Sequence, residues 1–241
     1  MRCLRHGVLV LVLACLSFAP KSYAQSFDTL DLLSQDNFRV LAENLSAATH
    51  YRGITPTEPL GIIGFDIGLS LSATSIDDEI LDLANGGDIG TSQIFLPRLH
   101  VHKGLPFGID IGAFIAADPN TDISLLGAEI RKAIFEGTVL TPAVGIRVGF
   151  STLEGVDDLS LQSTSIDLSI SKGVLIFTPY AGVGYVFTNA EAGDEFGLDD
   201  EDFGEEKYYV GLNVNLGFNF TFEADRTGDY NTIGAKAGIR F

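Results

Sequence analysis

The sequence predicts an all-β protein in which about ten antiparallel strands, or eight as the fallback, close into a transmembrane β-barrel. Three observations lead to this prediction. Short segments alternate apolar and polar residues along the chain, which is typical of strands with two different faces. The polar positions are rich in glycine and carry charges of both signs. After residue 24 there is no run of about 18–20 apolar residues, so helical membrane spans are not expected, although the mean hydropathy is +0.24.

The last segment, residues 231–241, shows the alternation most clearly. One face carries Ile233, Ala235, Ala237, Ile239 and Phe241, and the other carries Gly234, Lys236, Gly238 and Arg240. Its length suits a tilted membrane strand of about 9–11 residues. The pattern and its terminal Phe resemble the closing strand of bacterial outer-membrane β-barrels. This resemblance implies a place in the outer membrane of a Gram-negative bacterium and assembly by the barrel-assembly machinery, with Ile239 and Phe241 as the assembly signal.

Residues 1–24 are predicted to be a secretory signal peptide. A positively charged start is followed by an apolar run at 7–19 and by a small-x-small cleavage sequence at 22–24. The apolar run is too short for an anchor across a hydrocarbon core of about 30 Å. The sequence around Cys15 resembles a lipoprotein box, but the apolar run continues past it. Because both cysteines, Cys3 and Cys15, lie in this segment, the mature chain is expected to contain no thiol.

The chain is strongly acidic, with 15 basic and 32 acidic residues and a net charge of −17. Removal of residues 1–24 takes away three basic residues and no acidic one, so the net charge becomes −20. Nucleic acids and anionic lipid surfaces favour basic proteins. The charge therefore argues against both kinds of partner.

Residues 25–60 are predicted to form a short amphipathic helix and a linker. Ser34 can cap a helix within 26–52, and Pro56 and Pro59 end it. Apolar residues recur at helical spacing at Phe38, Leu41, Leu45 and Ala48. Such a narrow stripe does not identify the surface that it packs on, so a cap on the barrel rim and a plug in the lumen both stay open.

Residues 61–241 are predicted to form the barrel. The alternating segments are 61–74, 95–102, 107–115, 126–131, 144–150, 164–171, 181–187, 208–215, 218–224 and 231–241. The second contains a proline, which removes a ladder donor, and this is one reason for the eight-strand fallback. Dividing 208–225 near 216–217 gives an even count, as in single-chain bacterial barrels. The short connections then lie at one end of the barrel, and the acidic loops 75–93 and 189–207 lie at the other.

The apolar faces are expected to touch lipid and the glycine-rich, charged faces to line the lumen. A soluble sandwich or lipocalin-type barrel would also alternate, but glycine is poor on a strand exposed to water and useful in a narrow lumen. Five acidic and five basic residues balance one another on these faces, which predicts cross-lumen ion pairs and a mostly filled lumen. The expected lumen-facing polar network is Asp66, Arg98, His100, His102, Asp110, Glu129, Arg131, Arg147, Asp167, Glu223, Lys236 and Arg240.

His100 and His102 share the inward face of one predicted strand. With a nearby carboxylate they could serve acid/base chemistry or bind a metal, but polar packing explains them as well and spacing supplies no third ligand. The acidic run 191–206 lacks the Asp-x-Asp-x-Asp-Gly spacing of a calcium loop. We therefore predict no catalytic residue, no metal site and no cofactor.

These observations favour an integral outer-membrane barrel that is structural or, like a porin, passes small or apolar solutes through a mostly filled lumen. Two alternatives stay open. One is an outer-membrane enzyme that acts on lipid or peptide through His100 or His102, and the other is a surface barrel that binds cations through its acidic loops. The expected partners are outer-membrane lipid, lipopolysaccharide and the barrel-assembly machinery, with no nucleic acid, and the expected state is a monomer.

Overall fold

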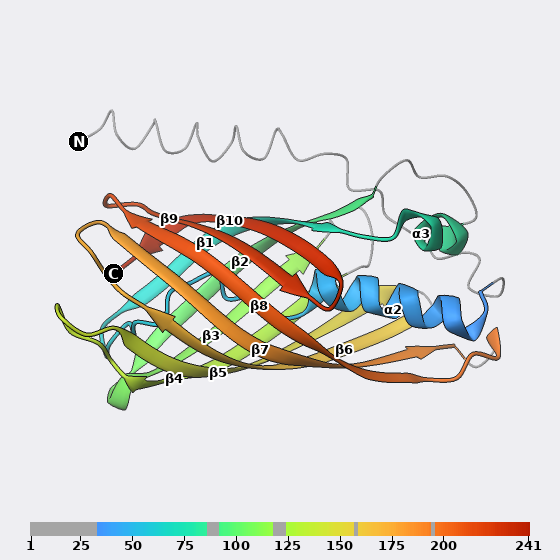
Figure 1. Cartoon of the computed structure of the whole chain (residues 1–241), viewed down its shortest axis with the longest axis horizontal. Coiled ribbons are helices and arrows are strands. Elements are labelled where there is room, and N and C mark those ends of the chain that lie inside the picture. Colours follow the sequence, from blue (N-terminus) through green and yellow to red (C-terminus); the bar gives the residue numbers. More distant parts are fainter. Residues whose placement is uncertain (1–32, 86–91, 118–123, 157–158, 194–195) are drawn as a thin grey trace.

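Ten strands form one closed antiparallel barrel in the computed structural model, which describes residues 33–85, 92–117, 124–156, 159–193 and 196–241 (Figure 1). The strands are β1 (Phe65–Ser75), β2 (Gln93–Leu105), β3 (Ile109–Ala117), β4 (Ser124–Phe135), β5 (Ala143–Val156), β6 (Leu159–Ser171), β7 (Phe177–Ala192), β8 (Glu201–Asn215), β9 (Asn219–Thr227) and β10 (Tyr230–Arg240). Each strand pairs with its neighbours in the sequence, and β10 returns to β1. The predicted fold class and the count of ten are confirmed, and the eight-strand fallback is wrong.

The last strand closes the barrel along most of its length. β10 pairs with β1 from Arg240 opposite Asp66 to Thr232 opposite Thr74. Beyond this ladder, Phe65 and Phe241 exchange two backbone hydrogen bonds of 2.9 Å, and their rings stack with centroids 5.9 Å apart. A closed ladder pairs the backbone groups of every strand, which is the condition for crossing hydrocarbon with strands.

Pro97 does not interrupt β2. It lies opposite Leu71 of β1 on the outward face, and the described ladder with β3 begins only at Leu99 opposite Ile115. Within the described residues Pro97 therefore has a partner strand on one side only, where a missing N–H is tolerated.

The predicted acidic loop 189–207 is wrong in its extent. β7 continues to Ala192 and β8 begins at Glu201, so only residues 193–200 connect them. Phe203 explains the difference, because it points inward, is buried and lies under the Arg39 guanidinium at 4.4 Å from the ring centroid. The period of two thus continues through a run whose charge alone indicated a loop. The other predicted loop, 75–93, contains helix α3 (Asp78–Asn85), and its residues 86–91 lie outside the described residues.

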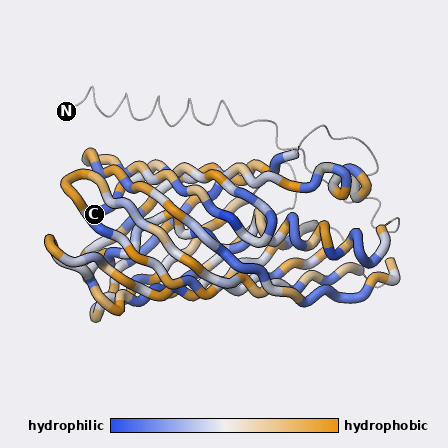
Figure 2. Tube along the Cα trace, in the orientation of Figure 1, coloured by the Kyte–Doolittle hydropathy of each residue, from blue (hydrophilic) through white to orange (hydrophobic). Residues whose placement is uncertain are grey.

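The two faces of the strands differ in polarity along the barrel, as the alternating colours of Figure 2 show. Outward Ile67, Ile111, Ile146 and Val183 are 46%, 44%, 40% and 50% exposed, whereas the inward polar side chains are buried. A soluble barrel would pack these four residues at its centre, so that alternative is wrong. An exposed apolar band around a closed barrel is the surface that a bilayer covers.

Helix α2 (Gln35–Thr49) begins after Ser34, whose hydroxyl accepts a hydrogen bond from the Asn37 N–H at 3.2 Å. It lies in the end of the barrel that carries α3 and the β7–β8 connection, and the chain then continues inside the barrel toward the end where Phe241 lies (Figure 1). The part of the predicted helix before residue 33 and the predicted signal peptide lie outside the described residues. No helix in the described part of the chain is long and apolar enough to span a membrane.

Candidate functional site

The candidate site is the lumen together with the chain that occupies it, residues 34–60, which we call the luminal segment. Phe38, Leu41, Ala47 and Ile54 of this segment are each 0% exposed. A ten-strand barrel has a wider interior than an eight-strand one, which side chains alone can fill. In this barrel the luminal segment takes up the additional space.

Residues 34–49, which we call the upper part of the luminal segment, pack mainly through apolar contacts. At the α3 end of the barrel the inward positions change from polar to apolar, and α2 buries its stripe against them. The cluster includes Phe38, Leu41 and Leu45 of the helix with Leu125, Leu153, Leu161, Ala190 and Phe203 of the wall. Burial of this area stabilises the position of α2 by about 25 cal/mol per Å² of apolar surface.

The C-terminal end of α2 and the residues that follow are held by polar contacts. Arg52 forms an ion pair of 3.0 Å with Asp225, and both side chains are 1% exposed. Arg98 of the wall donates to the Ala48 carbonyl at 2.7 Å, which is one of the carbonyls that the helix end leaves unpaired. Lys207 donates to the Tyr51 carbonyl at 3.3 Å.

Residues 55–60, which we call the lower part of the luminal segment, lie beyond the helix, and their contacts are polar as well. Wall arginines donate to its carbonyls, Arg131 to Pro56 at 2.8 Å and Arg240 to Glu58 at 3.0 Å. The Leu60 N–H donates to Asp110 at 3.1 Å. Further contacts run to β6 and the residues after it, where the Thr57 hydroxyl donates to Ser169 Oγ at 2.8 Å and Glu58 accepts from the Gly173 N–H at 2.7 Å.

The predicted lumen-facing residues lie on the inward face, and most of them take part in ion pairs. The pairs between wall residues are Arg131–Asp110 at 2.6 Å, Arg147–Glu129 at 3.1 Å, Arg147–Asp167 at 3.6 Å, Lys236–Asp66 at 3.1 Å and Arg240–Asp66 at 3.4 Å. Glu223 instead accepts a hydrogen bond from the Tyr180 hydroxyl at 2.7 Å. Arg98 pairs with the luminal segment, which the sequence prediction did not anticipate.

Sequence reasoning missed several charged residues of the site, among them Lys207, Asp225 and Arg52. Lys207 lies 3.5 Å from Asp167, and Asp225 holds Arg52. Both wall residues continue the period-two alternation of β8 and β9, so extending each predicted strand by one position would have found them. Arg52 gave no comparable signal, because its partner is 173 positions away.

His100 and His102 lie in the lumen with stacked rings whose centroids are 6.0 Å apart. Ser70 Oγ is 2.8 Å from Nε2 of His100, and Nε2 of His102 is 3.5 Å from Glu129. The Tyr51 hydroxyl lies 3.4 Å from the same Nε2 of His102. Both rings are at most 1% exposed, so a substrate could reach them only after the luminal segment moves.

Glycines of the wall make room for the luminal residues. A Cβ on Gly149 would lie 2.8 Å from the Cβ of Tyr51, and a Cβ on Gly112 would overlap the His102 ring. Side chains at these positions would therefore displace Tyr51 and His102. Among the described residues no group of three or more His, Cys, Asp or Glu side chains is placed to hold a metal ion.

The closed ladder, the exposed apolar band and the buried polar interior define an integral outer-membrane β-barrel protein. Neither a protein-family model nor a curated protein matches the chain.

Solved barrels of similar fold include the N-terminal β-barrel domain of Pseudomonas aeruginosa OprF, with 13% identity over 72% of this chain and 97% of that one and a TM-score of 0.37. Ail, the attachment invasion locus protein of Yersinia pestis, has 12% identity over 74% and 98% of the two chains and a TM-score of 0.32. The KdgM porin, solved with disordered oligogalacturonate, has 12% identity over 74% and 99% and a TM-score of 0.36. These similarities concern the fold, and the class rests on the geometry of this chain.

Proposed function

We propose that this protein is a conduit for small solutes in the outer membrane and that its luminal segment is the gate. With the luminal segment inside the lumen, the barrel is in its closed state. The observation that carries the proposal is the polarity of the contact between the luminal segment and the wall in the membrane-spanning part.

Polar surfaces can separate in water at low cost, because water replaces the hydrogen bonds that are lost. Arg98, Arg131 and Arg240 donate to carbonyls of the luminal segment, and a hydrated lumen would satisfy these groups as well. A segment packed only through apolar side chains would instead expose hydrocarbon on leaving. The lower part of the luminal segment is therefore suited to leave the lumen, while the apolar cluster around α2 retains the upper part.

The wall also resembles the lining of a water-filled passage. In the described part its inward face carries eight carboxylates and six cations, so we expect at most a weak preference for cations. These residues are Asp66, Asp110, Glu129, Asp167, Glu201, Glu205, Glu223 and Asp225 with Arg98, Arg131, Arg147, Lys207, Lys236 and Arg240.

Disulfides test whether the luminal segment controls passage. The Thr57 and Ser169 hydroxyl oxygens lie 2.8 Å apart, so Thr57→Cys with Ser169→Cys would tie the lower part of the luminal segment to the wall. Ser163 Oγ lies 3.0 Å from Thr188 Oγ1, so Ser163→Cys with Thr188→Cys ties wall to wall and is the matched control. The mature chain has no other cysteine if the signal peptide is removed.

Single-channel currents in planar bilayers are the measurement. We expect rare openings of the unmodified barrel and their loss when the Thr57→Cys, Ser169→Cys double variant is oxidised. Reduction should restore the openings, and the control disulfide should have no effect. Deletion of residues 34–57 should give frequent openings. A deletion variant that is folded by heat-modifiable gel mobility and still carries no current would overturn the proposal in favour of a purely structural barrel.

The expected partners and the monomeric state belong to the same proposal. Outer-membrane lipid and lipopolysaccharide would surround the apolar band, and the barrel-assembly machinery would insert the chain. No observation favours the enzymatic alternative, since His100 and His102 are both buried in the closed state and the Tyr51 hydroxyl lies against His102.

A further inference from the structure

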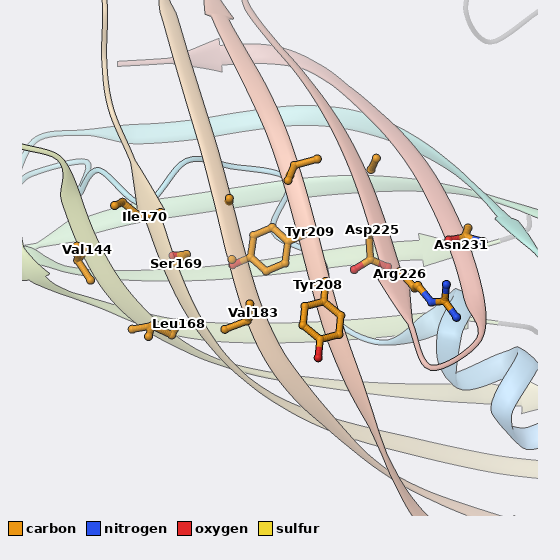
Figure 3. Close-up of a pocket in the computed structure, with 14 residues that line it drawn as sticks. Val144, Leu168, Ser169, Ile170, Val183, Tyr208, Tyr209, Asp225, Arg226 and Asn231 are labelled. Atoms are coloured by element: carbon orange, nitrogen blue, oxygen red, sulfur yellow. The ribbon is translucent and has the colours of Figure 1, made fainter.

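The outer surface of the barrel has a groove that the conduit does not use. It lies over β5 to β10, has a volume of about 720 Å³ and is largely apolar (Figure 3). Most of the residues that line it, such as Leu168, Val183 and Val210, lie on the outward face of these strands, so it opens toward the lipid.

The register of the strands explains the groove. One outward row crosses neighbouring strands through Ala181, Val210 and Ala224, which lie directly opposite one another. A second row beside it contains Val183, Tyr208 and Arg226, again in register. The first row forms the floor, because two of its three side chains are only methyl groups, and the larger residues of the second row form one side.

The groove is long enough for one acyl chain. The second row continues from Leu168 on β6 to Asn231 on β10, and thus crosses five strands. At about 4.8 Å between neighbouring strands this distance is about 19 Å. One leaflet of a bilayer is about 15 Å of hydrocarbon, so an oblique groove of this length spans one leaflet.

The end of the groove at Arg226 lies at the edge of the hydrocarbon. Along β8 the outward residues are apolar up to Tyr208, and the next outward residue is Glu206, whose carboxylate accepts a 2.5 Å hydrogen bond from the Tyr208 hydroxyl. Arg226 lies directly opposite Tyr208 and close to the β9–β10 turn. A lipid headgroup would therefore meet Arg226, Glu206 and Asp229 at this end.

These charges fit a headgroup of both signs. Arg226 is 56% exposed and its Nη2 lies 3.1 Å from Asp229, which is 94% exposed. An exposed pair of this kind is weak, so a phosphate can replace Asp229 at the guanidinium at low cost. The freed Asp229 and Glu206 would then face an ammonium group. A headgroup with only negative charge would be repelled by these two carboxylates.

We propose that the groove binds a phospholipid whose headgroup carries a phosphate and a free ammonium, as in phosphatidylethanolamine. One acyl chain lies over Ala181, Val210 and Ala224, the phosphate binds Arg226, and the ammonium lies between Glu206 and Asp229. The protein thereby selects this lipid from the anionic lipids around it.

Native mass spectrometry of the purified full-length barrel tests this, after incubation with equal amounts of phosphatidylethanolamine, phosphatidylglycerol and lipid A. We expect one retained phosphatidylethanolamine per barrel. Ala224→Phe fills the floor and should lower retention by at least about tenfold, which corresponds to about 1.4 kcal/mol. Arg226→Gln should lower it severalfold and reduce the preference over phosphatidylglycerol.

The control is Ala237→Phe, which adds the same side chain at an outward alanine of β10 away from the groove and should leave retention unchanged. Heat-modifiable mobility reports whether each variant is folded, and Ala181→Leu replaces Ala224→Phe if that variant fails to fold. Equal or stronger retention of phosphatidylglycerol or lipid A would overturn the proposal. Undiminished retention in a folded floor variant would do the same.

Discussion

Arg52 of the luminal segment and Asp225 of β9 form a buried ion pair of 3.0 Å that joins the gate to the wall. The same guanidinium donates to Thr232 Oγ1 at 3.0 Å and to the Ala47 and Ala48 carbonyls. One residue thus links the end of α2 to both strands of the last hairpin. Its removal would leave the Asp225 carboxylate buried without a counter-ion, although the Thr227 hydroxyl would still donate to it.

We expect Arg52→Met to destabilise the barrel by about 3–5 kcal/mol, because Asp225 would keep its charge in a closed interior. The measurement is the midpoint of thermal unfolding followed by gel mobility, together with the frequency of channel openings, which should rise. The double variant Arg52→Met with Asp225→Leu removes both charges and should lose clearly less stability. Equal losses in the single and double variants would show that the pair is not what holds the segment.

Gly149→Ala should destabilise the closed state by about 1–3 kcal/mol, because the new methyl group would lie 2.8 Å from both Tyr51 Cβ and Ser165 Oγ. Gly234→Ala is the matched control. Its nearest neighbour is the flexible end of Ile54 at 3.2 Å, so we expect a change within about 0.5 kcal/mol. Urea unfolding in detergent or lipid measures both. Similar effects of the two substitutions would contradict close packing of Tyr51 against β5.

Ile146→Arg tests the lipid-facing surface. Ile146 is 40% exposed on the outward face of β5, and an arginine there should cost about 2–4 kcal/mol if the position lies near the bilayer midplane. Val139→Arg places the same residue in the β4–β5 turn, where Val139 is 92% exposed, and should be close to neutral. The difference should be present in lipid bilayers, and tolerance of arginine at both positions would argue against a membrane-embedded band.

Phe241→Ser should lower the fraction of chains that assemble, as measured by heat-modifiable mobility in outer-membrane extracts. Phe241 stacks on Phe65 and completes the pairing of β10 with β1, so its loss weakens the closing step. The control is Phe135→Ser, because Phe135 is an equally terminal aromatic residue of β4 with 65% exposure. A reduction of the same size in both variants would indicate a general loss of aromatic surface in place of an assembly signal at the last strand.

The strands could be predicted from the sequence because the alternation of apolar and polar residues that distinguishes the two faces of a strand is visible within a few neighbouring residues. Ile67, Ile111 and Ile146 alternate with glycine or charged residues, and each indeed faces outward. The same local pattern placed Asp66, Arg131 and Lys236 on the inward face. It failed where charge outweighed periodicity, as in Glu201 to Lys207, which form the start of β8.

The sequence by itself determined a membrane barrel of about ten strands and its two faces, since alternation is a local property of each strand. Only the tertiary structure decided where residues 34–60 lie and which charges meet. The apolar stripe of α2 could have packed on many surfaces, and Arg52 finds Asp225 only after β9 has closed into the wall. Contacts between such distant residues depend on closure of the barrel, and no local pattern records them.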